Sequence, residues 1–215
     1  MKRTLLSILV IGILLLSACG TPTTEIPSAS EPQIPTHFTT YTDEAGFFSI
    51  SYSPDWEPFP SWFEELGADS RDFFKSYDSN VSLVGLFFVF MAEAPMESGV
   101  SSANVNIVIQ SLSDMTIRGW WTLDEIVEAK LQRTEEIEEE YHEFSRVKTI
   151  IDGREAVIID WESFTSDLSG KVRCVQMFTI ADEIVWKVTC YADSTKFADF
   201  EDDFLAIVRS LRILK

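Results

Sequence analysis

Residues 144–163 read FSRVKTIIDGREAVIIDWES, and this stretch carries the plainest structural signal in the chain. Two apolar-rich runs flank Asp152-Gly153, a dipeptide typical of a two-residue hairpin turn because that turn requires positive φ. The pattern predicts strands over residues 144–151 and 154–163. A tight turn of this kind joins antiparallel strands, so the stretch favours an antiparallel sheet.

A second hairpin is predicted from residues 171–180 and 184–191, which flank the three-residue loop Ala181-Asp182-Glu183. In this register Cys174 lies directly opposite Cys190. Opposed residues on paired strands have Cβ atoms about 4.5–5.5 Å apart, close enough for a disulfide after a small adjustment. Because an exported protein meets an unreduced setting, we expect this disulfide, with two small thiols buried in the core as the alternative.

Hydrophobic patterning predicts further elements on both sides of these hairpins. The alternation in GFFSISY, residues 46–52, is typical of a half-buried strand. Thr122 and Glu125 fit a capping box that opens a helix over 122–140. Apolar residues at three- and four-residue spacing predict a helix over 197–211. The other expected elements are one or two helices over 61–77, opened by a Ser61–Glu64 capping box, strands over 81–94 and 104–112, and a short strand over 211–214.

Hairpins dominate this order of elements, which predicts an α+β fold: a mostly antiparallel sheet flanked by helices. Two segments also resemble the PsbP/DcrB-like family, YTDEAGFFSISYSPDW at 41–56 and FADFEDDFLAIVRSLRI at 197–213. The resemblance implies an α/β/α sandwich over residues 38–215. That family includes a photosystem accessory protein and many bacterial lipoproteins of unassigned role. Its motifs are structural, so the resemblance implies no site residue.

The chain begins MKRTLLSILVIGILLLSACG, with two basic residues ahead of an apolar stretch. This stretch is about 12–15 residues long, whereas a membrane-spanning helix needs about 20, so we predict a signal peptide over residues 1–18. Leu16-Ser17-Ala18-Cys19 resembles the bacterial lipobox, which implies cleavage before Cys19 and lipid attachment to its thiol. Two or more acyl chains, such as palmitate, hold a protein durably on a membrane. The alternatives are an ordinary cleaved signal with an incidental cysteine, or an uncleaved anchor.

The predicted tether follows the lipidated cysteine. Residues 20–36, GTPTTEIPSASEPQIPT, contain four prolines among threonines and serines and are too poor in apolar residues to fold. Fully extended, such a segment reaches about 50 Å. We therefore expect three parts: the signal peptide over 1–18, the lipidated Cys19 with its tether over 19–37, and one folded domain over 38–215.

Composition and motifs restrict the possible functions. The 17 basic and 35 acidic residues give a formal charge of −18, which repels phosphate backbones and excludes a nucleic-acid partner. The sequence has no nucleophile elbow, phosphate loop or Cys-x-x-Cys motif, and we predict no catalytic residue, metal or cofactor. We interpret His37 as solvated and His142 as a favourable cation near a helix end. The acidic run 135–140 is interpreted as a solvated helix face and not as a calcium site.

Two aromatic clusters provide the candidate binding surface. Trp56, Trp62 and Phe63 lie in a proline-containing connection, and an extended backbone at Trp120-Trp121 would expose one of the two rings. Core packing is the alternative for both clusters. The sequence thus favours a lipid-anchored extracytoplasmic accessory or binding module without catalytic activity, whose partner is an envelope protein or a small ligand. The other candidates are a lipoprotein that binds a small apolar or cationic solute, and an envelope hydrolase with an unrecognised site.

Overall fold

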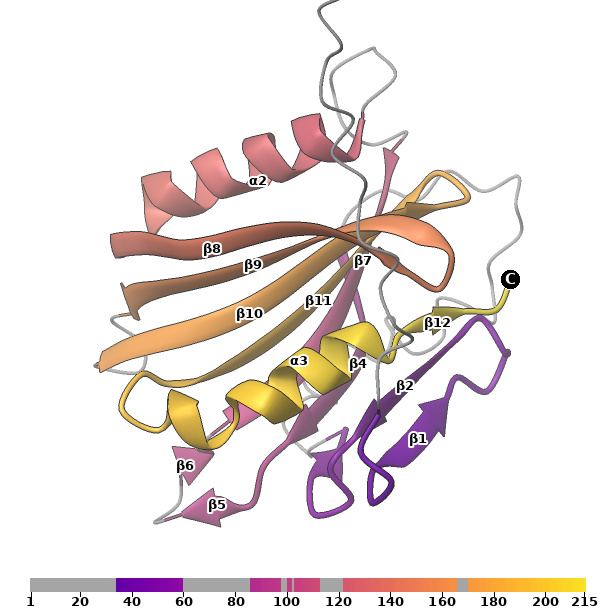
Figure 1. Cartoon of the computed structure of the whole chain (residues 1–215), viewed down its shortest axis with the longest axis horizontal. Helices are drawn as coiled ribbons and strands as arrows, with labels where there is room; N and C mark the ends of the chain where they lie inside the picture. The colour runs from indigo at the N-terminus through magenta and orange to yellow at the C-terminus, as the bar shows by residue number, and fades with distance from the viewer. Residues whose placement is uncertain (1–33, 60–85, 98–99, 102, 113–121, 166–169) are drawn as a thin grey trace, which may run out of the picture.

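The computed structural model describes residues 34–59, 86–97, 100–101, 103–112, 122–165 and 170–215. Its centre is an antiparallel seven-stranded sheet with the order β3-β4-β7-β11-β10-β9-β8 (Figure 1). The prediction of a mostly antiparallel sheet is therefore confirmed. In chain order the strands are β3 (Glu57–Pro58), β4 (Leu86–Glu93), β7 (Ala103–Ser111), β8 (Glu139–Ile151), β9 (Arg154–Thr165), β10 (Gly170–Ala181) and β11 (Ile184–Asp193).

A smaller three-stranded sheet brings the two ends of the domain together. It has the order β1-β2-β12, and Ile213 near the C-terminus pairs with Phe48. The sequence indicated the second and third of these strands, but neither the first strand nor a separate sheet. The strands are β1 (Thr39–Thr42), β2 (Phe48–Tyr52) and β12 (Arg212–Ile213), and a two-stranded ladder joins β5 (Met96–Glu97) to β6 (Val100–Ser101).

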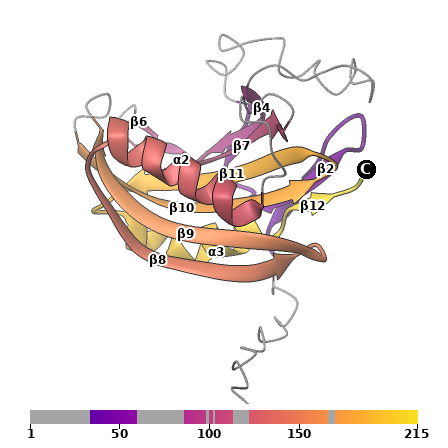
Figure 2. The ribbon, with the colours of Figure 1, turned by 90° about the horizontal axis from the view of Figure 1, so that it is seen from above.

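A helix packs on each face of the seven-stranded sheet, as Figures 1 and 2 show from two directions. Helix α2 (Leu123–Ile137) contacts β8, β9 and β10. Helix α3 (Glu201–Arg209) follows a short 3-10 helix, η3 (Phe197–Asp199), and contacts β2, β10 and β11. The buried side chains that these helices contribute are Ile126, Val127 and Leu131 from α2, and Phe204, Ile207 and Val208 from α3.

The first predicted hairpin is confirmed. Ile151 pairs with Arg154, so the loop between β8 and β9 consists of Asp152 and Gly153 alone. Their φ angles are 52° and 73°, as a type I′ turn requires. The Asp152 carboxylate also accepts hydrogen bonds from Arg154 at 2.5 Å and from the backbone N–H of Ile213 at 2.9 Å. The turn is thereby fixed to the smaller sheet.

The second hairpin exists, but its predicted register is wrong. Ala181 pairs with Ile184, so the loop has two residues instead of three. Cys174 consequently lies opposite Tyr191, and Cys190 lies opposite Val175. Because side chains alternate between the faces of a strand, a one-residue shift moves one cysteine to the other face of the sheet. Both cysteines are buried and free, so the structure does not contain the predicted disulfide.

Helix boundaries differ from the prediction at several places. The Thr122–Glu125 capping box is present, but α2 ends at Ile137, and Glu139 already belongs to β8. The acidic run 135–140 is therefore divided between a helix and a strand instead of lining one helix face. The predicted C-terminal helix is likewise divided into η3 and α3.

Several predictions lie outside the described residues. These are the signal peptide, Cys19, most of the tether, and the helix over 61–77 with its Ser61–Glu64 capping box. Within the described part of the chain, none of the helices has the length and apolar character needed to span a bilayer.

Candidate polar binding site

The structure separates the residues that the sequence singled out. Trp56 is 5% exposed and packs its ring against Phe200 and Phe204, so its placement is in the core and not on a binding surface. Trp62, Phe63, Trp120 and Trp121 lie outside the described residues.

The two histidines are both exposed, and they lie in different parts of the fold, one beside the smaller sheet and one in the larger sheet. His37 precedes β1, and its ring packs edge-on against Phe38. His142 belongs to β8 and packs edge-on against Phe144, so its predicted position near a helix end is wrong. Among the described residues, no group of three His, Cys, Asp or Glu side chains is placed to hold a metal ion.

A different set of side chains forms the candidate site. On the α2 side of the seven-stranded sheet, the central strands carry polar residues where a sheet interior is normally apolar. Their register places Asn106, Thr189 and Gln176 side by side on three neighbouring strands. All three side chains are buried. We define the polar patch as Asn104, Asn106 and Gln110 of β7, Lys187, Thr189 and Tyr191 of β11, Gln176 of β10, and Lys130 of α2.

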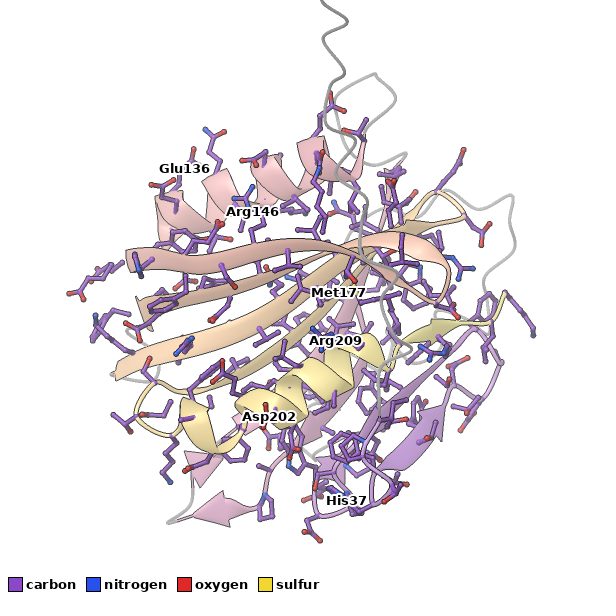
Figure 3. The ribbon with its side chains drawn as sticks, viewed as in Figure 1. His37, Glu136, Arg146, Met177, Asp202 and Arg209 are labelled. Atoms are coloured by element: carbon purple, nitrogen blue, oxygen red, sulfur yellow. The ribbon has the colours of Figure 1, made fainter. Side chains whose placement is uncertain are left out.

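Alternation in β7 explains how the polar patch forms. Its odd-numbered residues Val105, Ile107 and Ile109 belong to the core on the α3 side. The even-numbered residues point to the opposite face, beside the apolar cluster that α2 covers. Met177, a core residue of β10, likewise lies on the α3 side of the sheet (Figure 3). The sequence showed this alternation but indicated a solvated polar side, whereas Asn104 is only 3% exposed.

Hydrogen bonds satisfy only part of the polar patch. The Gln176 side-chain amide donates to the Thr189 hydroxyl at 3.0 Å, and the Lys130 ammonium donates to the Gln110 carbonyl oxygen at 2.5 Å. Asn104 hydrogen bonds the Tyr191 phenol. The buried Oδ1 of Asn104 has no hydrogen-bond partner among the described residues. Such an atom is costly to bury, so it marks a place where a hydrogen-bond donor of a ligand would be stabilising.

The two lysines of the polar patch are electrostatically unusual. Burial, together with a smaller contribution from the neighbouring Lys130 ammonium, lowers the pKa of Lys187 to about 8. Burial also lowers the pKa of Lys130 itself. Within the described part of the chain, neither ammonium forms an ion pair. Exposed basic residues on β8 differ in this respect, since Arg146 pairs with Glu128 and Glu143, and Lys148 pairs with Asp124.

The cysteines do not offer a reactive thiol near this site. Burial raises the pKa of both Cys174 and Cys190. A thiol is nucleophilic only as the thiolate, so each side chain acts as a small apolar group.

A second cluster of charged and aromatic groups lies on the α3 side and is structural. The Arg173 guanidinium bonds both oxygens of the Asp160 carboxylate, at 2.9 and 2.6 Å. It also lies 4.4 Å from the ring centroid of Phe144 and 4.3 Å from that of Phe197. This cation is enclosed by a bidentate carboxylate and two rings. Arg173 therefore connects β8, β9 and β10 to η3, and its charge is already balanced by Asp160.

Comparisons with known proteins show the fold. No protein-family model matches the chain, and no curated protein matches its sequence. The solution structure of the cyanobacterial PsbP, CyanoP, from Synechocystis sp. PCC 6803 superposes with a TM-score of 0.51 at 10% identity, covering 82% of this chain and 92% of that one. LpqN, described as involved in cell envelope biogenesis of Mycobacterium tuberculosis, superposes with a TM-score of 0.50 at 7% identity, covering 83% and 86%. The expected PsbP-like fold is thereby supported.

Sequence reasoning missed the polar patch. The available signals were the asparagines and glutamine that alternate along 104–110, and a lysine and a threonine inside the otherwise apolar run 184–190. Neither signal identifies a site alone, because the two segments become neighbours only through the pairing of β7 with β11.

Proposed function

We propose that this protein is a lipid-anchored, extracytoplasmic module that binds a ligand or an envelope protein without catalysing a reaction. The polar patch carries the binding part of this proposal. The unsatisfied Oδ1 of Asn104 and the two lysines, which have no counter-charge among the described residues, destabilise the free domain, and such groups are typical of a binding site. The resemblance of Leu16–Cys19 to the lipobox supports the anchor, and the involvement of LpqN in cell envelope biogenesis is consistent with this location.

The residues of the polar patch favour binding over catalysis. A hydrolase of the Ser or Cys type needs a nucleophile within hydrogen-bond reach of a general base. Here the Thr189 hydroxyl accepts a hydrogen bond from the Gln176 amide, which cannot act as a base. The neighbouring Cys174 thiol is held protonated by burial.

Membrane partitioning tests the anchor. We expect the full chain, expressed in a bacterium that processes lipoproteins, to enter the detergent phase of a phase-separation assay, and its mature N-terminal peptide to carry lipid mass. Cys19→Ala is expected to move the protein to the aqueous phase. Cys174→Ala is the matched control and should partition like the wild type. Equal partitioning of the Cys19 and Cys174 variants would refute the anchor.

An activity screen tests the absence of catalysis. Purified full chain is offered ester, amide, glycoside and phosphoester substrates, alongside Lys187→Gln. We expect no turnover above that of the buffer. Turnover that disappears in Lys187→Gln would replace the binding function with a catalytic one, since a lysine with a pKa of about 8 is able to act as a base.

A further inference from the structure

We infer that the polar patch binds a small anion with carboxylate or phosphate oxygens, held by the ammonium groups of Lys187 and Lys130. This inference rests on the proposed binding function and names the ligand class for it. It also differs from the apolar or cationic solute that the sequence suggested, because two adjacent ammonium groups repel a cation.

The position of Lys187 gives the first argument. Its register neighbours are Val108 on β7 and Phe178 on β10, so it projects from an apolar row of the central sheet. A lysine in such surroundings is destabilising unless an opposite charge approaches it. Only an anion reduces both the burial cost and the repulsion from Lys130.

The charged and titratable groups that surround Lys187 in the described structure do not include a carboxylate close enough to neutralise it. Lys130 faces it from α2, and Cys174 from β10. Tyr191 lies four residues further along β11, level with Asn104 of β7 and Glu93 of β4. Four residues of strand span about 13 Å, too far for an ion pair between Glu93 and Lys187. Among the described residues, the lysine pair therefore has no internal counter-charge.

Neutral groups around the lysines suit the oxygens of such an anion. The Gln110 side chain already contacts Lys130, and its amide nitrogen remains available as a donor. Asn106, Thr189 and Gln176 form the adjacent row of the sheet. A carboxylate or phosphate accepts several hydrogen bonds at once, so it can be held by lysine and amide donors together.

The rest of the molecule makes the lysine pair distinctive. The chain carries 35 acidic and only 17 basic residues. Other partly buried cations in the described regions lie against carboxylates, as Arg173 does with Asp160 and Arg154 does with Asp152. Against this background, Lys187 and Lys130 stand out because neither is paired with a carboxylate in the part of the chain that the structure describes.

Thermal denaturation and calorimetry of the detergent-solubilised full chain test the inference. Succinate, inorganic phosphate and chloride are compared at pH 7 and constant ionic strength. We expect succinate or phosphate, but not chloride, to raise the Tm in a saturable manner, and the stronger of the two distinguishes a carboxylate from a phosphate ligand. Lys187→Gln and Lys130→Gln should each weaken binding about ten- to a hundredfold. Lys148→Gln, which removes an exposed lysine paired with Asp124, is the matched control.

A measurement on the wild-type chain avoids dependence on folded variants. Lysines are labelled by reductive 13C-methylation, and the Lys187 resonance is titrated by NMR with and without the anion. Binding should move its pKa upward from about 8, and affinity should fall as the pH rises through that value. An unmoved pKa, or equal shifts of the Tm in all variants, would overturn the inference. Neither result affects the partitioning of the Cys19 variant, so failure of the anion site and failure of the anchor are distinguishable.

Discussion

Lys187 is charged at a place where the protein would be more stable with a neutral side chain. Its pKa is about 8 in the native state, against 10.5 for an ordinary lysine. The unfolded chain therefore binds more protons between these two values, and stability rises with pH across that window. At pH 7, where the lysine is charged in both states, this difference corresponds to destabilisation on the order of 3 kcal/mol.

Replacing this lysine should accordingly stabilise the domain. We expect Lys187→Met to increase the free energy of unfolding by about 1–3 kcal/mol at pH 7, with the gap to the wild type closing as the pH rises from 8 to 10.5. Urea denaturation at pH 7, 8 and 9.5 measures the gap, and Lys148→Met provides the exposed control. A gap that is independent of pH would contradict the assignment of the effect to Lys187.

Ser210 differs from Lys187 because it is a buried polar residue whose hydroxyl forms hydrogen bonds within the protein. Its hydroxyl lies 2.7 Å from the carbonyl oxygen of Ile207, and it accepts a hydrogen bond from the backbone N–H of Ser51 at 2.8 Å. The side chain thus joins the end of α3 to β2. The backbone N–H of Ser51 would lose its acceptor without it.

We therefore predict that Ser210→Ala lowers the free energy of unfolding by about 1–3 kcal/mol, because a buried N–H is left unsatisfied. Chemical denaturation measures this loss. Ser145→Ala, on the exposed part of β8, should change stability by less than about 0.5 kcal/mol. Equal effects of the two substitutions would mean that the Ser51 contact is not stabilising.

At the scale of the element, the two hairpins show what sequence can and cannot determine. Gly153 identified the first turn because glycine adopts positive φ without strain. The second turn places Asp182 and Glu183 at φ of 51° and 62°. The pair Asp-Glu is not typical of a two-residue turn, so the sequence did not predict one. Because the predicted loop was one residue too long, the prediction placed Cys174 and Cys190 on the same face of the sheet, whereas they lie on opposite faces.

The strain in the second turn can be relieved. We expect Glu183→Gly to stabilise the domain by about 0.5–1 kcal/mol, since a non-glycine residue is disfavoured at positive φ. Gly153→Ala is the reciprocal change and should destabilise it by about 1 kcal/mol. Thermal denaturation of both variants checks the pair. Destabilisation by Glu183→Gly would show that side-chain contacts of Glu183 outweigh the backbone strain.

The polar patch could be predicted only in part. Alternation along β7 correctly separates Val105 and Ile107 from Asn104 and Asn106. Whether the polar side is wet or buried depends on β4, β11 and α2, which come from distant parts of the chain. The C-terminal strand shows the same limit, because its pairing with β2 joins residues more than 150 positions apart in sequence.

At the scale of the whole molecule, the charge of −18 opposes folding through repulsion among like charges. Added salt screens this repulsion. We predict that raising NaCl from 10 to 300 mM increases the Tm by about 2–4 °C, corresponding to about 1 kcal/mol. Lys187→Gln should show the same increase, which separates general screening from occupancy of the polar patch. A Tm that falls with salt would contradict the prediction.

The placement of Cys174 and Cys190 on opposite faces of one sheet has a consequence for how the domain responds to reducing agents. An intramolecular cross-link between them cannot form without rebuilding the pairing of β10 with β11. The melting behaviour of the domain should therefore be the same with and without dithiothreitol.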